Sequence, residues 1–355
     1  LASRRQRQMC IRDRKKKMDR ESLLAYRDHL GVEISDDMVE EDPFVELSSD
    51  SRALAYANDR RSSLGGPLPS RSPSPMGLEM PESSVFSEFD SGTPEKQKVS
   101  TTMVFVRLLR SLMKSGIGKQ VPVIPDEGRT FGMDPLFSEF GIFSLGGQKY
   151  TPVDHAMLMN YKESESGQIL QEGISEAGAM ATWTAAATSY AHSGVGSIPF
   201  YIFYSMFGFQ RVADQVWAAA DARARGFLMG ATAGRTTLNG EGLQHQDGHS
   251  LLLASTVPSV RAWDPAYAYE LATIIQYGIR EMVVDEKDMI HYVMLYNDNE
   301  SQPAKTEGCD EGIIRGAYRL SADDESNGPK VRLLGSGPIL KLSLIHISEP
   351  TRLWT

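Results

Sequence analysis

The sequence is poor in cysteine and has no long apolar run. Its 355 residues include two cysteines, Cys10 and Cys309, which argues against a disulfide framework and fits a reducing cytoplasm. No window approaches the roughly 20 consecutive apolar residues of a membrane-spanning helix. The basic first residues are not followed by an apolar stretch, which argues against a secretory signal. We therefore expect a cytoplasmic chain without a membrane partner.

Several familiar catalytic motifs are also missing. The sequence has no HExxH zinc-protease signature, no Gly-x-Ser-x-Gly elbow, no phosphate loop and no dinucleotide fingerprint at a strand-to-helix turn. No set of side chains has the spacing of a metal site. The chemistry must therefore be sought in less common patterns.

Charge is unevenly distributed along the chain. The formal net charge is −9, but residues 1–17 hold eight Lys or Arg and one Asp, so residues 18–355 carry −16. A body this acidic argues against a nucleic-acid partner, because binding phosphates requires a basic surface.

Composition divides the chain into segments. Residues 1–14 and 343–355 resemble translated sequencing-adapter DNA, so we expect both to be non-native. Residues 15–99 predict a linker, which is charged and loosely helical over 18–60 and rich in Ser, Pro and Gly over 61–98. Residues 100–335 have the pattern of a folded domain, and 336–342 are expected to begin a further, truncated domain.

The folded segment alternates between strand and helix patterns. Ser100-Thr101-Thr102 signals a helix start, and apolar residues follow at helical spacing through Met113. Further helices are predicted over 168–187, 205–224 and 266–282, and strands over 121–125, 198–204, 227–229, 291–296 and 331–334. This alternation predicts an α/β fold, a parallel sheet flanked by helices on both faces, with ligands at the carboxyl ends of the strands.

Two acidic residues stand in the segment predicted as a helix over 168–187. Glu172 and Glu176 are four residues apart and would share a helix face. Spacing alone favours a solvated acidic stripe. However, residues 177–188 are mostly small and apolar, so a carboxylate at the mouth of this helix is expected to be partly buried. Such a group suits the sharing of a proton with a ring nitrogen, and the residues alone leave both readings open.

Two other clusters lie at the ends of predicted strands. The aromatic run Pro199–Arg211 is typical of a core, although it also suits the stacking of a planar ring. The loop Gly234–Ser250 holds two His and two acidic residues. Its glycines oppose the helix that an HxxxH metal pair requires, so binding of an anionic substrate with proton transfer near pH 7 is favoured over a metal site. A plain surface loop remains open as well.

Four long strings in this order carry a family resemblance: DEGRTFGMDPLF, GQILQEGISEAGA, PFYIFYSMFGFQR and GRTTLNGEGLQHQDGHS. The chain resembles the homodimeric bacterial pyruvate dehydrogenase first component, a thiamine diphosphate enzyme, over about residues 100–335. The resemblance implies that 100–335 is the domain that binds the aminopyrimidine ring of the cofactor.

The resemblance also assigns site residues. It implies that Glu176 contacts N1′ of the aminopyrimidine and promotes its imino tautomer, that Tyr204 and Phe207 pack around this ring, and that His245 faces the substrate. The resemblance also implies that Asp126, a cofactor contact, and Glu127 line the same site, and that Glu241 lies close by. It implies a supporting position for Glu172 and His249, next to the residues that contact the ligand.

The function implied is oxidative decarboxylation of pyruvate, with transfer of the acetyl unit to the lipoyl domain of dihydrolipoyl acetyltransferase by a homodimer. The Gly-Asp-Gly…Asn segment that holds diphosphate and Mg²⁺ in the family has no counterpart here, and we expect it upstream of residue 1. A catalytically inactive fragment, a related 2-oxo acid dehydrogenase and a transketolase-like enzyme are the alternatives.

Overall fold

The computed structural model describes residues 18–348 except 42–46, 64, 67–74, 117–118, 126–127, 154–160, 236–237, 239–241, 322–327 and 330–331. The chain divides into two compact units, Leu1–Arg71 and Ser72–Thr355. The described elements of the first unit are two helices, α2 (Arg20–Leu30) and α3 (Arg52–Ser63), and neither buries a side chain.

The second unit is built on a parallel sheet. Within the described residues its six strands lie in the order β4 (Leu170–Gln171), β1 (Gln120–Ile124), β5 (Ile198–Tyr204), β6 (Gly226–Ala231), β8 (Ile290–Met294) and β7 (Val260–Trp263). Every neighbouring pair is parallel, as predicted. The chain runs from β1 to β4 on one side and then to β5 on the other, so the strand order reverses at β1.

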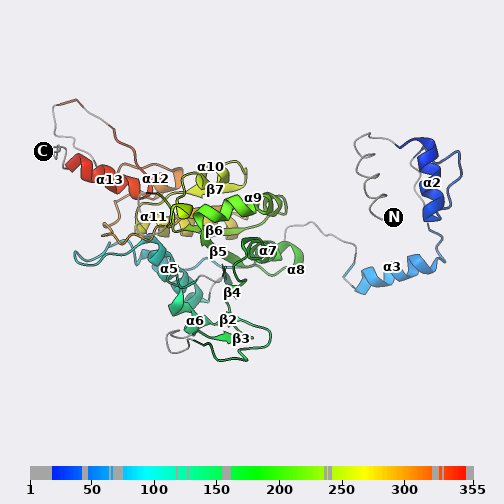
Figure 1. Cartoon of the computed structure of the whole chain (residues 1–355), viewed down its shortest axis with the longest axis horizontal. Helices are drawn as coiled ribbons and strands as arrows, with labels where there is room; N and C mark the ends of the chain where they lie inside the picture. Colours follow the sequence, from blue (N-terminus) through cyan, green and yellow to red (C-terminus); the bar gives the residue numbers. More distant parts are fainter. Residues whose placement is uncertain are drawn as a thin grey trace. The chain divides into compact units, whose positions relative to one another are not determined.

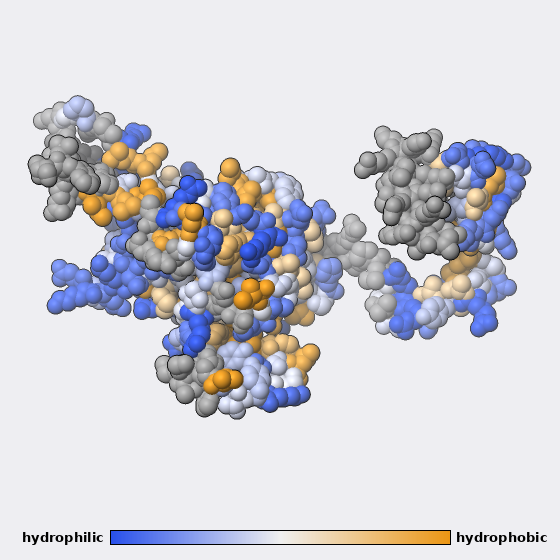
Figure 2. Space-filling view, viewed as in Figure 1, coloured by the Kyte–Doolittle hydropathy of each residue, from blue (hydrophilic) through white to orange (hydrophobic). Residues whose placement is uncertain are grey.

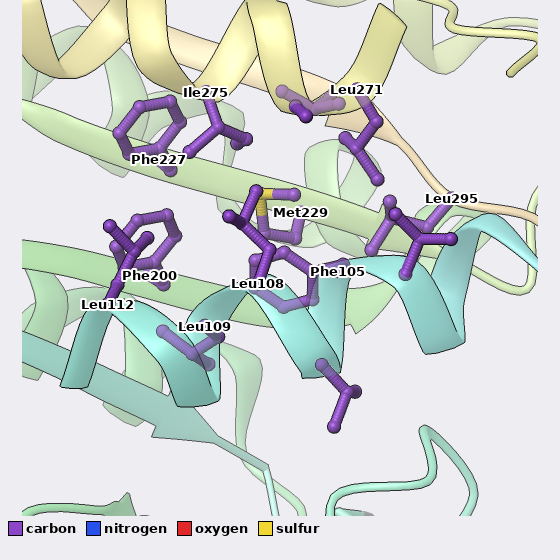
Figure 3. Close-up of a cluster of buried hydrophobic side chains, with 14 of the residues drawn as sticks. Phe105, Leu108, Leu109, Leu112, Phe200, Phe227, Met229, Leu271, Ile275 and Leu295 are labelled. Atoms are coloured by element: carbon purple, nitrogen blue, oxygen red, sulfur yellow. The ribbon is translucent and has the colours of Figure 1, made fainter. Parts of the chain in front are cut away.

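Helices cover both faces of this sheet, which confirms the predicted α/β layers (Figure 1). One face carries α5 (Thr101–Ser115) and α11 (Ala268–Val283). The opposite face carries α7 (Glu176–Ala187), α9 (Ser205–Asp221) and α10 (Ser250–Ala254). Figure 3 shows apolar side chains of α5 and α11 meeting Phe200, Phe227 and Met229 of the sheet.

The central strand β5 is buried on both faces. Phe200 and Ile202 belong to the core under α5 and α11, whereas Tyr201 and Phe203 belong to the core under α7 and α9. This alternation follows from the two-residue period of a strand. Each such side chain stabilises the fold by about 1.5–3 kcal/mol on burial.

Short elements complete the unit: α4 (Ser84–Ser87), α6 (Asp134–Phe140), β2 (Ile142–Phe143), β3 (Glu163–Ser164), α8 (Ser189–Ser193), the 3₁₀ turn η1 (Leu243–His245), α12 (Asp310–Arg315) and α13 (Gly337–Ser348). Strands β2 and β3 pair apart from the main sheet. Hydrophobic residues, orange in Figure 2, lie together on the surface of α13, where Ile339, Leu342 and Ile345 are exposed. No helix among the described residues is long and apolar enough to span a bilayer.

The segment that precedes α5 differs from the expected linker. Met76, Phe86 and Phe89 are buried, and all three join the core under α5 and α11. Gly196 makes close contact with this segment, because a Cβ there would lie 2.0 Å from the carbonyl oxygen of Met76. The linker was predicted from the average composition of the segment, which is dominated by Ser, Pro and Gly and does not reveal a few widely spaced apolar residues that are buried.

The last predicted strand was wrong. Residues 332–336 form no strand, and Val331 lies outside the described residues. An extended segment forms a strand only where a neighbour satisfies its backbone groups, and a local apolar pattern does not reveal that neighbour.

A buried ion cluster lies at the amino ends of β7 and β8. The Glu281 carboxylate is fully buried and accepts hydrogen bonds from Arg261 at 2.8 and 3.0 Å and from Lys287 at 3.0 Å. His291 Nδ1 accepts from the Trp263 indole at 3.1 Å, which leaves Nε2 protonated 3.4 Å from Glu281. Burial raises the pKa of Glu281, but these donors outweigh it and lower the pKa to about 2.

This cluster predicts a loss of stability in acid. The pKa of Glu281 in the folded chain lies below its ordinary value of 4.5. The contribution of its charge to folding stability is therefore fully present above pH 4.5 and declines as pH falls towards 2. Replacement of Glu281 by Gln should lower the free energy of unfolding by about 1–3 kcal/mol at pH 7. Urea unfolding should show that the difference in free energy of unfolding between this variant and the unmodified chain narrows as pH falls from 4.5 to 2. A constant difference would contradict the assignment.

Candidate active site

Strand β5 passes into α9 without a loop. Tyr204 ends the strand with φ −65° and ψ 123°, and Ser205 is the first helical residue. Tyr204 and Phe207 therefore lie within one turn of each other, and their ring centroids are 5.9 Å apart. The strand end thus presents two aromatic rings together.

His245 joins these two rings from the loop that follows β6. It ends η1, and its ring centroid lies 5.0 Å from that of Tyr204 and 5.3 Å from that of Phe207. We call Tyr204, Phe207 and His245 the ring cluster. The structure therefore brings together three residues that the sequence placed 41 positions apart at most.

Glu176 lies at the start of α7, beside the ring cluster. Ser175 caps this helix by accepting a hydrogen bond from the Gly178 N–H at 3.2 Å. The Glu176 side chain is 15% exposed, and its Oε1 contacts Nη1 of Arg211. The Arg211 guanidinium carbon lies 4.4 Å from the centroid of the Phe207 ring. Arg211 therefore bridges the carboxylate and the ring cluster.

The sequence interpretation missed Arg211 and two further neighbours. Arg211 follows Phe207 by four residues, so its helix position was a usable signal, but its contact with Glu176 spans 35 residues. Tyr201 donates its hydroxyl to the Glu176 carbonyl oxygen at 3.4 Å. Burial, and then the charge of Glu176, raise the pKa of Tyr201, so its hydroxyl stays protonated. Phe131 lies 5.1 Å from Tyr204 between ring centroids.

Glu172 does not share a helix face with Glu176. The predicted helix over 168–187 was wrong at its start, because β4 occupies Leu170–Gln171 and Gly173 turns the chain at φ +71°. Glu172 instead accepts a hydrogen bond from the Thr182 hydroxyl. The strand pairs with β1, a partner distant in sequence, and that pairing overrides the local helical pattern.

The remaining expected site residues stand differently. Asp126, Glu127 and Glu241 lie outside the described residues. His249 is described, and its Nδ1 lies 3.5 Å from the carboxylate of Asp247. Among the described residues no group of His, Cys, Asp and Glu is arranged to hold a metal ion.

The site coincides with the point where the strand order reverses. Ligands of open parallel sheets bind at the carboxyl ends of strands on either side of such a point. Tyr204 ends β5, Glu176 begins the helix after β4, and His245 lies in the loop after β6. A partly exposed carboxylate and planar rings at this position suit a heteroaromatic ligand with a titratable nitrogen.

Solved transketolases define the fold class. The chain aligns with transketolase from Leishmania mexicana with a TM-score of 0.53 and 17% identity, covering 77% of this chain and 35% of that one. Transketolase from Pichia stipitis with sedoheptulose-7-phosphate gives a TM-score of 0.50 and 16% identity over 78% and 35% of the two chains. At such identities the comparison shows the fold alone.

Sequence comparison identifies the family. The model described as "Pyruvate dehydrogenase E1 component middle domain" matches residues 78–303, and the chain belongs to that family. Pyruvate dehydrogenase E1 components from Cupriavidus necator and Pseudomonas aeruginosa are 48% and 49% identical over 94% and 92% of this chain. That from Escherichia coli is 47% identical over 94%. The chain spans 37–38% of the length of these relatives.

Gly208 is required where α9 begins over the sheet. A Cβ at this position would lie 1.9 Å from Cε2 of Phe203, a fully buried ring. Replacement of Gly208 by Ala should therefore destabilise the chain by about 1–3 kcal/mol through overpacking, as measured by urea unfolding. Trimming the ring with Phe203→Leu should reduce this cost in the double variant. Simple additivity of the two losses would show that this contact does not constrain α9.

Proposed function

We propose that this chain supplies the pyrimidine-binding half of the active site of a thiamine diphosphate-dependent pyruvate dehydrogenase. The reaction is the oxidative decarboxylation of pyruvate, with transfer of the acetyl unit to the lipoyl domain of dihydrolipoyl acetyltransferase. A homodimer in the cytoplasm and Mg²⁺ as a second cofactor belong to the same proposal. The observation that carries it is the contact of Glu176, through Arg211, with the ring cluster.

The residues present fit the aminopyrimidine part of this cofactor. Its ring is planar and basic, so it requires an aromatic neighbour and a carboxylate able to share a proton. Tyr204 at the end of β5 and Phe207 in the first turn of α9 provide the aromatic neighbours, and Glu176 at the start of α7 provides the carboxylate.

Each residue has a defined role in this proposal. Glu176 holds or releases the proton shared with the ring nitrogen, and Arg211 fixes the carboxylate oxygen Oε1. Tyr204 and Phe207 orient the ring. His245 moves a proton at the substrate, as an imidazole can near neutral pH. Thiamine diphosphate, when bound, supplies the nucleophilic carbon and the electron sink for decarboxylation. Asp126, Glu127 and Glu241 are proposed to line the same site.

A hybrid enzyme tests the proposal. The Cupriavidus necator relative, with its matching segment replaced by residues 18–335 of this chain, should decarboxylate pyruvate only when thiamine diphosphate is added. Replacement of Glu176 by Gln removes the proton-sharing carboxylate at constant size, so activity should fall by about 10²–10⁴-fold. Pyruvate-dependent reduction of a soluble electron acceptor measures this rate.

A matched carboxylate provides the control. Glu139 is on α6, where it pairs with Arg110 and Lys114 of α5 at 2.6 and 2.7 Å, and it has no role in the proposed site. Glu139→Gln should leave the rate within about twofold of the parent hybrid. A folded hybrid that keeps its rate after Glu176→Gln, or one that shows no cofactor dependence, would refute the proposed function.

A further inference from the structure

Asp247 makes a buried hydrogen-bonded anchor in the loop that carries His245. Its side chain is fully buried, and its Oδ1 accepts the backbone N–H groups of His249 and Ser250, each at 3.0 Å. Its Oδ2 accepts the Ser250 hydroxyl, which in turn accepts the Tyr292 hydroxyl at 2.9 Å. The carboxylate thereby joins the loop to the start of α10 and to strand β8.

The backbone of Asp247 closes the same loop from the other side. Its N–H donates to the carbonyl oxygen of Gly234 at 3.0 Å. Gly234 lies three residues beyond β6, whereas Asp247 lies three residues before α10. The two ends of the loop are therefore tied together at one residue, and the anchor holds the base of the loop against the sheet.

The bonds to Asp247 also stabilise its charge. Burial raises the pKa of this carboxyl, but Ser250 and the backbone N–H groups of His249 and Ser250 outweigh burial and lower the pKa. The buried hydroxyl of Ser205, the first residue of α9, adds to this lowering. A buried charge held by several donors costs much to displace, which makes the anchor rigid.

His245 is close enough for this anchor to fix its place. Only Gln246 separates it from Asp247, and a two-residue step spans at most about 7 Å. The η1 turn limits the remaining freedom, because the N–H groups of His245 and Gln246 donate to the carbonyl oxygens of Gly242 and Leu243. The His245 ring then meets Tyr204 and Phe207 at the distances given above.

We infer that Asp247 is a positioning residue that holds the loop so that the His245 ring lies against Tyr204 and Phe207. The inference has a geometric part, which concerns only where the loop and the His245 ring lie, and a catalytic part, which concerns the effect of that position on the rate. The catalytic part rests on the proposed function, in which His245 acts at the substrate, whereas the geometric part does not. An ordinary helix cap would stabilise α10 without affecting His245, so the two readings differ in what removal of the carboxylate does to that ring.

The geometric part is tested on the chain itself. The sequence has seven histidines, so ¹³Cε1-histidine labelling resolves them, and His245→Ala identifies the signal of His245. Asp247→Ala should move this signal towards that of a solvent-exposed histidine. It should also speed amide hydrogen exchange over residues 234–250 by about tenfold or more. Ser250→Ala, which keeps both backbone bonds, should have a smaller effect on each.

Asp288 provides a matched carboxylate at the opposite end of the sheet, where it pairs with Arg223 and Arg225. Asp288→Asn should lower stability without changing exchange over 234–250 or the His245 signal. If Asp247→Ala does not fold, Asp247→Asn carries the test, since it keeps one acceptor oxygen and loses the other. An unchanged His245 signal in the Asp247 variant that folds would overturn the inference.

The catalytic part is tested in the hybrid enzyme. Asp247→Ala should lower kcat by about 10- to 100-fold, since displacement of a reacting group by about 1 Å has that effect. In a His245→Ala background it should cause no further loss, because it acts through His245. An additional loss of the same size would overturn the positioning role. Cofactor-dependent activity that Glu176→Gln abolishes would leave the proposed function standing in that case.

Discussion

Burial of β5 on both faces is the constraint on which the rest of the structure depends. Its aromatic residues alternate between two cores, so neither its register nor its direction can change without exposing large rings. Because Gly208 lets α9 begin directly over Phe203, the strand ends in a helix without a loop. The position of Tyr204, Phe207 and Arg211 is therefore set by core packing.

Local pattern predicted what depends on local physics. The bounds of β5 were predicted as Ile198–Tyr204, and Ser100 was identified as a helix start; it accepts a hydrogen bond from the Met103 N–H at 3.2 Å. The parallel fold with two helical layers followed from the alternation of elements. The wrong predictions concern segments whose structure depends on contacts with residues distant in the sequence. Pairing with β1 makes residues 170–171 a strand where a helix was expected, and Met76 and Phe86 are buried in a segment expected to be a linker.

The candidate site shows the same division. Tyr204, Phe207, His245 and Glu176 were assigned by the family resemblance, and the structure places the three rings together with Glu176 linked to them through Arg211. Arg211 and Asp247 were not selected, because their importance rests on contacts that become visible only in three dimensions. A carboxylate between two histidines gives no local sign that it is buried, nor that its partners include the serine that contacts β8.

The two ends of the sheet use buried charge differently. At the amino end, the Glu281 and Asp288 carboxylates are paired with cations from Arg261, Lys287, Arg223 and Arg225. At the carboxyl end, Asp247 accepts hydrogen bonds from backbone N–H groups and from the Ser250 hydroxyl, and the His249 imidazole lies 3.5 Å away. These donors stabilise the carboxylate at the residue that ties the two ends of the loop together. Arg211 contacts Glu176, the proposed proton-sharing carboxylate, so the fixing of the loop and the pairing of that carboxylate depend on different side chains.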